Sequence, residues 1–117
     1  MSSPFAITPE QPITLAIEGS DAVFPVNRVY CIGRNYAAHA REMGGDPTRE
    51  APFFFMKPAD TVVSCPPGRA IELPFPSMTD AYHFEAEMVV VLGAGGQNTP
   101  ESDALAHVFG YAAGLDM

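Results

Sequence analysis

Basic residues are scarce in this sequence of 117 residues, which has six Lys and Arg residues against 14 Asp and Glu residues. The formal net charge of −8 at pH 7 excludes the broad basic surface needed to bind a phosphate backbone or an anionic membrane. We therefore expect no nucleic-acid partner and no membrane partner. An acidic substrate would need local positive charge, from a metal ion or from a few placed Lys and Arg side chains.

Cysteine and long apolar runs are also scarce. The two cysteines, Cys31 and Cys65, show no CxxC spacing, which argues against a disulfide scaffold or a zinc ribbon. No apolar segment is long enough to span a bilayer, and the first residues lack the basic start and apolar run of a signal peptide. We therefore expect a reduced, cytoplasmic protein.

Short strands dominate the rest of the sequence. The β-prone runs are "ITLAI", "VYCI", "FFFMK", "YHFEAEMVVVL" and "VFGYAAGLDM", and we expect further short strands among the Pro and Gly turns of residues 59–80. Residues 1–26 are predicted to form a loose lead-in, and residues 27–117 the main domain. The 47% hydrophobic content suits one modest core.

Two helices are expected between these strands. The first begins at Asn35, a good N-cap, and ends at Gly44 and Gly45. The second begins with Thr99 as its cap and Pro100 at the first helical position. Because strands and helices alternate only sparsely, the sequence predicts an α+β domain and not a doubly wound fold.

Acidic side chains precede the apolar part of the strongest predicted strand. Alternation places His83, Glu85 and Glu87 on one face of residues 82–92. Two carboxylates on one face form half of a site for Mg²⁺, Mn²⁺ or Ca²⁺, which prefer oxygen ligands. In isolation the pattern favours a solvent-exposed strand start, because Glu is mostly exposed. Asp116 is either a third ligand or another exposed strand end.

Other candidate residues also have two interpretations. His39 and Glu42 stand three residues apart on the first predicted helix, so they share a face. Glu42 could orient His39 as a general base, or the two could form an ordinary surface pair. Lys57 ends an apolar strand and Arg34 follows Gly33; each could bind a substrate carboxylate or oxyanion, or simply face water.

Five segments, in family order, resemble the fumarylacetoacetate hydrolase superfamily. They are "CIGRNYAAHAREMGG", "APFFFMKPADTVV", "IELP", "YHFEAEMVVVLG" and "HVFGYAAGLDM". The stretch "GGDPTREAPFFFMKPADTVV" is most similar to the bacterial fumarylpyruvate hydrolases of gentisate and related aromatic breakdown. The resemblance implies the family's mixed β-sheet and β-roll fold. It also implies a homodimer.

The resemblance also implies roles for the candidate residues. The family's metal ligands fall on Glu85, Glu87 and Asp116, for Mg²⁺ or Mn²⁺, with Ca²⁺ as a substitute in a crystal. Its catalytic pair falls on His39 and Glu42. The family's substrate-binding positions fall on Lys57 and Arg34, and Lys57 is catalytic as well.

The implied reaction is hydrolysis of a C–C bond in an acylpyruvate, a small diketo acid, such as fumarylpyruvate to fumarate and pyruvate. Oxaloacetate decarboxylation or 2-oxo-acid isomerisation are alternatives within the family. The family pattern continues past Asp116 into further strands that this sequence does not contain. We therefore expect an N-terminal portion of the catalytic fold, incomplete at its C-terminus, whose missing half could be a separate chain. A non-catalytic fragment that pairs with such a chain is the alternative of another class.

Overall fold

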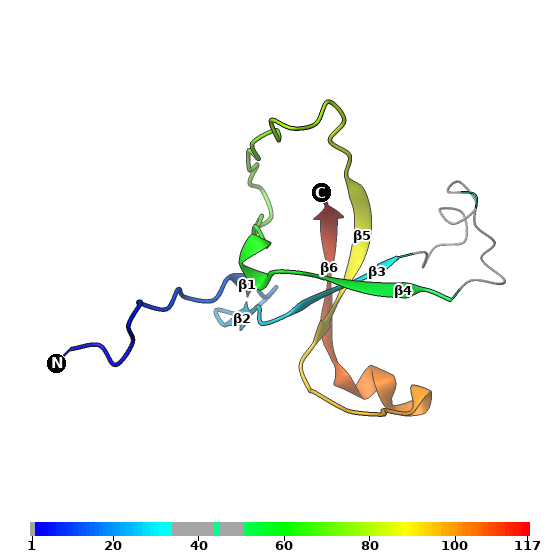
Figure 1. Ribbon diagram of the computed structural model, residues 1–117. Coiled ribbons are helices and arrows are strands. Elements are labelled where there is room, and N and C mark those ends of the chain that lie inside the picture. Colours follow the sequence, from blue (N-terminus) through cyan, green and yellow to red (C-terminus); the bar gives the residue numbers. More distant parts are fainter. Residues whose placement is uncertain (1, 34–43, 45–50) are drawn as a thin grey trace. The chain divides into compact units, whose positions relative to one another are not determined.

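Strands dominate the computed structural model, which describes residues 2–33, 44 and 51–117 (Figure 1). In those residues the strands form three two-stranded antiparallel sheets, with two short 3₁₀ helices between strands. The chain divides into two compact units, Met1–Ile71 and Glu72–Met117. This sheet-rich architecture with few helices confirms the predicted fold class. The division into a lead-in over 1–26 and a domain over 27–117 stays a prediction.

Some predicted features lie outside the described residues. These are the helix expected from Asn35, together with Arg34, His39 and Glu42.

The first sheet pairs β1 (Thr14–Ala16) with β2 (Val23–Pro25). Strand β1 confirms the run predicted around "ITLAI", whereas β2 was not predicted, because three residues ending in proline carry little strand signal. Gly19 lies in the connection with a φ of 74°, a backbone conformation that only glycine adopts without a steric penalty.

The second sheet pairs β3 (Val29–Gly33) with β4 (Phe53–Lys57). Both strands confirm predictions, since aromatic and β-branched side chains favour a pleated, half-covered surface. The register places Gly33 opposite Phe53. A Cβ atom built at Gly33 would collide with the Phe53 ring, so the missing side chain is what lets this ring lie across β3.

Residues 58–84 contain only one regular element, the 3₁₀ helix η1 (Ala59–Thr61). The prediction of further short strands here is therefore wrong. Proline lacks the N–H group that a strand ladder needs, and five prolines divide this stretch into short turns. One such turn carries a hydrogen bond from the Arg69 amide to the Pro66 carbonyl, at 3.2 Å.

The third sheet pairs β5 (Glu85–Leu92) with β6 (Val108–Asp116). The ladder runs from Glu85 opposite Asp116 to Val91 opposite Gly110, and its register shifts between Val91 and Leu92. The predicted strand began at residue 82, so the structure shortens it by three residues. His83 therefore precedes the ladder.

The connection between β5 and β6 contains the 3₁₀ helix η2 (Glu101–His107). Its N-cap is Pro100, and no side chain caps its first turn. The prediction of Thr99 as the cap is wrong. The Asp103 amide donates a 2.9 Å hydrogen bond to the Pro100 carbonyl, so the helix begins after Pro100 and Thr99 lies one residue before the cap. In the described part of the chain, no helix has the length and apolar character needed to cross a membrane.

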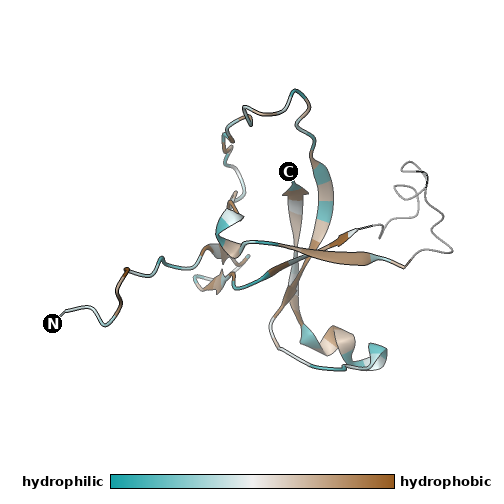
Figure 2. Ribbon diagram, in the orientation of Figure 1, coloured by the Kyte–Doolittle hydropathy of each residue, from teal (hydrophilic) through white to brown (hydrophobic). Residues whose placement is uncertain are grey.

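The apolar run of β5 is open, not buried. Met88, Val90 and Leu92 are 63%, 44% and 58% exposed, and no side chain among the described residues is fully buried. A sheet of two strands has no second layer to cover its faces. Figure 2 shows the polar start of β5 and the hydrophobic remainder of the strand.

Candidate metal centre on the β5–β6 sheet

Three carboxylates share one face at one end of the β5–β6 sheet. Glu85 lies directly opposite Asp116, and side chains of directly opposed residues stand on the same face. Glu87 follows two residues after Glu85, so it stands on that face as well. Glu87 and Asp116 are half-buried, whereas Glu85 is exposed. The pairing of two strands that are distant in sequence therefore brings all three acidic residues together.

The part of β6 beside these carboxylates carries small residues. On the carboxylate face it presents Gly110, Ala112 and Gly114 before Asp116. Gly114 is the direct partner of Glu87. A Cβ atom at Gly114 would lie 2.7 Å from the Cγ2 methyl of Val89, so this methyl occupies the space that a larger residue would take. No β6 side chain therefore stands directly across from Glu87.

The donor set of this face suits a hard divalent cation. Carboxylates placed opposite one another on a sheet repel each other, and Mg²⁺ or Mn²⁺ would relieve that repulsion while using their oxygens as ligands. Glu85, Glu87 and Asp116 each already take part in an interaction within the chain.

The carboxylate oxygens have not converged on one point. Among the described residues, no three His, Cys, Asp or Glu side chains are arranged as a cluster that could hold a metal ion. Backbone pairing fixes which face the side chains share, whereas their oxygens can still rotate about the side-chain torsions. The sheet thus places three carboxylates on a common face without gathering them around one point.

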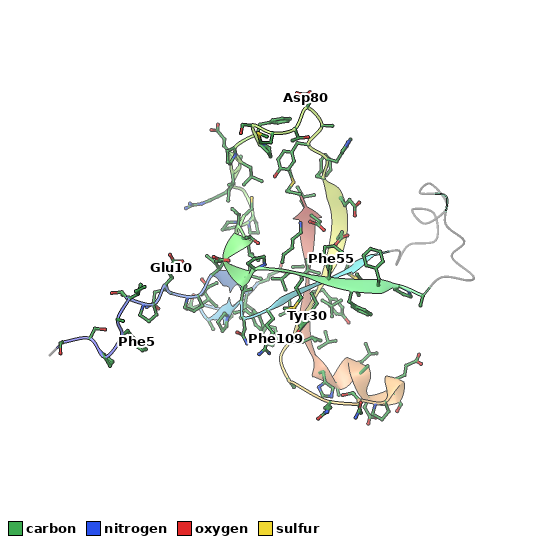
Figure 3. All side chains as sticks on the ribbon, in the orientation of Figure 1. Phe5, Glu10, Tyr30, Phe55, Asp80 and Phe109 are labelled. Atoms are coloured by element: carbon green, nitrogen blue, oxygen red, sulfur yellow. The ribbon has the colours of Figure 1, made fainter. Side chains whose placement is uncertain are left out.

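Lys57 lies in the other compact unit, at the end of β4 and opposite Val29. It is half-buried and takes part in an interaction. The pairing places it on the same face of the β3–β4 sheet as Phe53 and Phe55, whose ring centroids lie 6.0 Å apart. Tyr30 stands on the opposite face of that sheet (Figure 3). Lys57 therefore has an aromatic surface beside it on its own strand.

His83 is exposed and lies before the first residue of the β5–β6 ladder. Its neighbour Tyr82 packs edge-on against Phe75, with ring centroids 5.6 Å apart at 82°. A role for His83 beside the carboxylates stays a hypothesis.

Sequence reasoning missed the glycines that shape these two sheets. Gly33 gives room to the Phe53 ring, and Gly114 gives room to Val89. A signal for the second was present, because the small residues Gly110, Ala112 and Gly114 recur at every second position of the strand that ends at Asp116. For Gly33 the sequence offers no comparable pattern, since its close contact depends on the register with β4.

Comparison with known proteins places this chain in a family. The sequence model described as fumarylacetoacetate (FAA) hydrolase C-terminal matches residues 28–117. Oxaloacetate tautomerase FAHD1, mitochondrial, from Arabidopsis thaliana is 41% identical over 90 residues, which are 77% of this chain and 38% of the relative. Oxaloacetate decarboxylase, mitochondrial, from Dictyostelium discoideum is 39% identical over 90 residues, or 77% of this chain and 39% of the relative.

Two solved structures share the fold. Fumarylpyruvate hydrolase from Pseudomonas aeruginosa, crystallised with Mn²⁺ and pyruvate, is 58% identical with a TM-score of 0.93. A putative fumarylpyruvate hydrolase from Burkholderia cenocepacia is 39% identical with a TM-score of 0.74. The matches cover 96% and 97% of this chain but 48% and 46% of those chains, so it spans about half the length of its solved relatives. Both the family match and the shared fold agree with the five sequence segments, and the chain belongs to the fumarylacetoacetate hydrolase family.

Proposed function

We propose that the protein is a metal-dependent hydrolase that cleaves a C–C bond in an acylpyruvate, with fumarylpyruvate as the substrate. The observation that carries this proposal is the pairing of Glu85 with Asp116, which gathers three carboxylates on one sheet face. The solved fumarylpyruvate hydrolase with bound Mn²⁺ and pyruvate, 58% identical to this chain, supports both the substrate and the metal.

Glu85, Glu87 and Asp116 are the proposed ligands of Mg²⁺ or Mn²⁺. When bound, the metal supplies positive charge that attracts the keto-acid end of the substrate and polarises its oxygens. Such local charge is needed because the chain's net charge of −8 repels an anionic substrate at longer range. Ca²⁺ could replace either ion in a crystal, since it also takes oxygen ligands.

His39 is the proposed general base, and Glu42 orients it. His39 removes a proton from water, and the resulting hydroxide adds to the acyl carbonyl. The C–C bond to the neighbouring methylene then breaks, and its electron pair leaves with the pyruvate portion as an enolate. Protonation of that methylene gives pyruvate, while the acyl portion leaves as fumarate.

Lys57 and Arg34 are the proposed cationic groups of the substrate site. The Lys57 ammonium stabilises the oxyanion that forms when hydroxide adds to the acyl carbonyl. Arg34 binds a substrate carboxylate, for which its planar guanidinium offers two parallel donors. A small diketo acid is thus bound at its keto-acid end by the metal and elsewhere by these two side chains.

Oxaloacetate chemistry is the second candidate. The curated relatives include proteins named oxaloacetate tautomerase and oxaloacetate decarboxylase, at 41% and 39% identity. Tautomerisation or decarboxylation would use the same chelated 2-oxo-acid end without attack of water on a distal carbonyl. Both reactions need the three carboxylates. Tautomerisation also needs a base to take the proton beside the keto group, whereas decarboxylation releases CO₂ and does not.

Turnover by the purified protein with Mg²⁺ or Mn²⁺ tests the proposal. Addition of fumarylpyruvate should cause loss of the diketo absorbance and release of fumarate and pyruvate in equal amounts. Glu87→Gln should remove this activity, and Glu101→Gln on η2 should keep it. Turnover of oxaloacetate in place of fumarylpyruvate would favour the second candidate, and no turnover of either would favour a non-catalytic fragment that pairs with another chain. Mass measurement under native conditions tests the proposed homodimer.

A further inference from the structure

One face of the β3–β4 sheet carries two phenylalanine rings in line with Lys57. Phe53, Phe55 and Lys57 occupy alternate positions of β4, so their side chains share a face and follow one another about 7 Å apart along the strand. The β3 residues paired with them have smaller side chains, and these are Gly33, Cys31 and Val29. This aromatic face, made of Phe53, Phe55 and Lys57, lies within one compact unit.

Both rings of the aromatic face keep accessible surface. Phe53 is 48% exposed and Phe55 is 39% exposed, with ring centroids 6.0 Å apart and ring planes inclined by 31°. The Phe53 ring lies across Gly33, where a Cβ atom would collide with it, so one side of this ring rests on the β3 backbone. The two rings therefore offer a shallow apolar surface to a small molecule, next to a cationic side chain.

Aromatic rings beside an ammonium group suit a flat acid. An aromatic ring gains from offset stacking on another π system, and an ammonium group attracts a carboxylate or a polarised carbonyl oxygen. The fumaryl group has both features, because its C=C bond is conjugated with a carbonyl carbon on each side and keeps the group close to one plane. A saturated acyl group of the same length has tetrahedral carbons instead, which prevent flat contact with a ring.

The position of Lys57 connects this face to the acyl portion of the substrate. In the proposed reaction the Lys57 ammonium stabilises the oxyanion at the acyl carbonyl, so the acyl chain begins beside Lys57. Phe55 and then Phe53 are the next side chains of β4 on the same face. They are therefore the groups of this face that an acyl chain extending along β4 would contact.

We propose that Phe53 and Phe55 form the subsite for the acyl portion and make the protein selective for a flat, unsaturated acyl group over its saturated analogue. This inference rests on the proposed function, in which Lys57 acts at the acyl carbonyl, and it adds the residues that determine acyl specificity. Each ring contributes a π face that a leucine side chain of similar bulk lacks.

Binding of two product-like acids tests the subsite without turnover. Fumarate and succinate are both four-carbon dianions at neutral pH and differ in the central C=C bond. Ligand-observed NMR titration of the purified protein, without added metal, measures the Kd of each acid. We expect fumarate to bind roughly two- to tenfold more tightly than succinate, the range typical of an aromatic stacking contact, and Phe55→Leu to remove most of this preference.

Phe54→Leu is the matched control. Phe54 is 68% exposed and alternates with Phe53 and Phe55 on β4, so it stands on the opposite face. This variant should keep the preference for fumarate. Three results would overturn the proposal: equal affinities of the unmodified protein for the two acids, absence of binding of either acid, and equal losses of preference in the two leucine variants.

Turnover separates this inference from the proposed function. Fumarylpyruvate is compared with succinylpyruvate, which has the same charge and length and a saturated acyl group, in the presence of Mn²⁺. Hydrolysis of both with equal kcat/KM would leave the reaction standing and overturn the subsite. Hydrolysis of neither, with a fumarate preference that depends on Phe55, would overturn the reaction and leave an aromatic subsite for flat acids.

Intermolecular NOEs in the unmodified protein provide a measurement that does not depend on how a variant folds. We expect the vinyl protons of bound fumarate to show NOEs to the ring protons of Phe53 and Phe55, and none to those of Phe54. NOEs to Phe54 alone, or to none of the three rings, would contradict the inference.

Discussion

Glu85 and Asp116 are like charges placed directly opposite each other across two strands, an arrangement that weakens a sheet unless something offsets the repulsion. At the scale of single residues, this pair is the clearest departure from what folding alone would favour. The departure is consistent with a selected function, since functional sites commonly depart from the local rules that a fold otherwise obeys.

Glu85→Gln should lower the affinity for Mn²⁺ at least about tenfold, because it removes one negative ligand from the proposed site. Isothermal titration calorimetry of the purified protein measures the change. Glu101→Gln is the matched control, since Glu101 is exposed on η2 and lies outside the carboxylate face. Equal Mn²⁺ affinities for the two variants would exclude Glu85 as a ligand.

Gly33→Ala should destabilise the protein by roughly 1–3 kcal/mol, the cost of overpacking, because a Cβ atom there would collide with the Phe53 ring. Urea unfolding measures the free energy. Gly95→Ala is the control, since no atom lies within 4 Å of a Cβ at that position.

A double-mutant cycle identifies the cause of that cost. Gly33→Ala should be less destabilising in a Phe53→Ala background, where the ring no longer occupies the space. An equal cost in both backgrounds would show that the substitution acts through the backbone and not through the ring.

Strands are the elements that the sequence predicted best, because their signal is local. Runs of aromatic and β-branched residues marked β3 and β4, and "EAEMVVVL" marked β5. The ends of elements were less predictable. Strand β5 begins at Glu85 and not at Tyr82, because a strand also needs a partner in register, which a local pattern does not contain.

Helix caps show the same difference between local preference and structure. Thr99 has a good cap side chain, but Pro100 takes the cap position of η2. Thr99→Val should therefore change the free energy of unfolding by less than about 0.5 kcal/mol, as for an ordinary surface substitution. Thermal or urea unfolding measures this change.

Thr61 provides the contrast for that prediction. Its hydroxyl donates a 2.7 Å hydrogen bond to the Pro58 carbonyl at the start of η1. Thr61→Val should cost about 0.5–1.5 kcal/mol, the net value of a typical hydrogen bond. A larger loss from Thr99→Val than from Thr61→Val would restore Thr99 as the capping residue.

At the scale of the whole molecule, the site depends on a pairing that no local signal contains. Spacing alone placed Glu85 and Glu87 on one face, and it left Asp116 as an isolated strand end. The resemblance to the family assigned all three to one site, and the register then brought them together. The positions of Arg34, His39 and Glu42 lie outside the described residues, so their roles remain predictions from the resemblance.

Metal binding should stabilise the folded protein as a whole. A ligand that binds only the folded state at 100 times its Kd adds about 2.7 kcal/mol to the free energy of unfolding. We therefore expect Mn²⁺ to raise Tm by several degrees and EDTA to reverse the shift, as followed by thermal unfolding. The shift should be much smaller in Glu85→Gln, and an equal shift in that variant would place the ion elsewhere.

The register shift between Val91 and Leu92 marks where the protein should begin to tolerate inserted residues. It lies at the end of β5 remote from Glu85, next to the connection that contains η2. One codon inserted between Glu85 and Glu87 would turn one carboxylate of β5 to the opposite face, because neighbouring residues on a strand point to opposite sides. The same insertion in residues 93–100 would only lengthen a loop. Natural length variation among relatives is therefore expected in that loop and not in the strand.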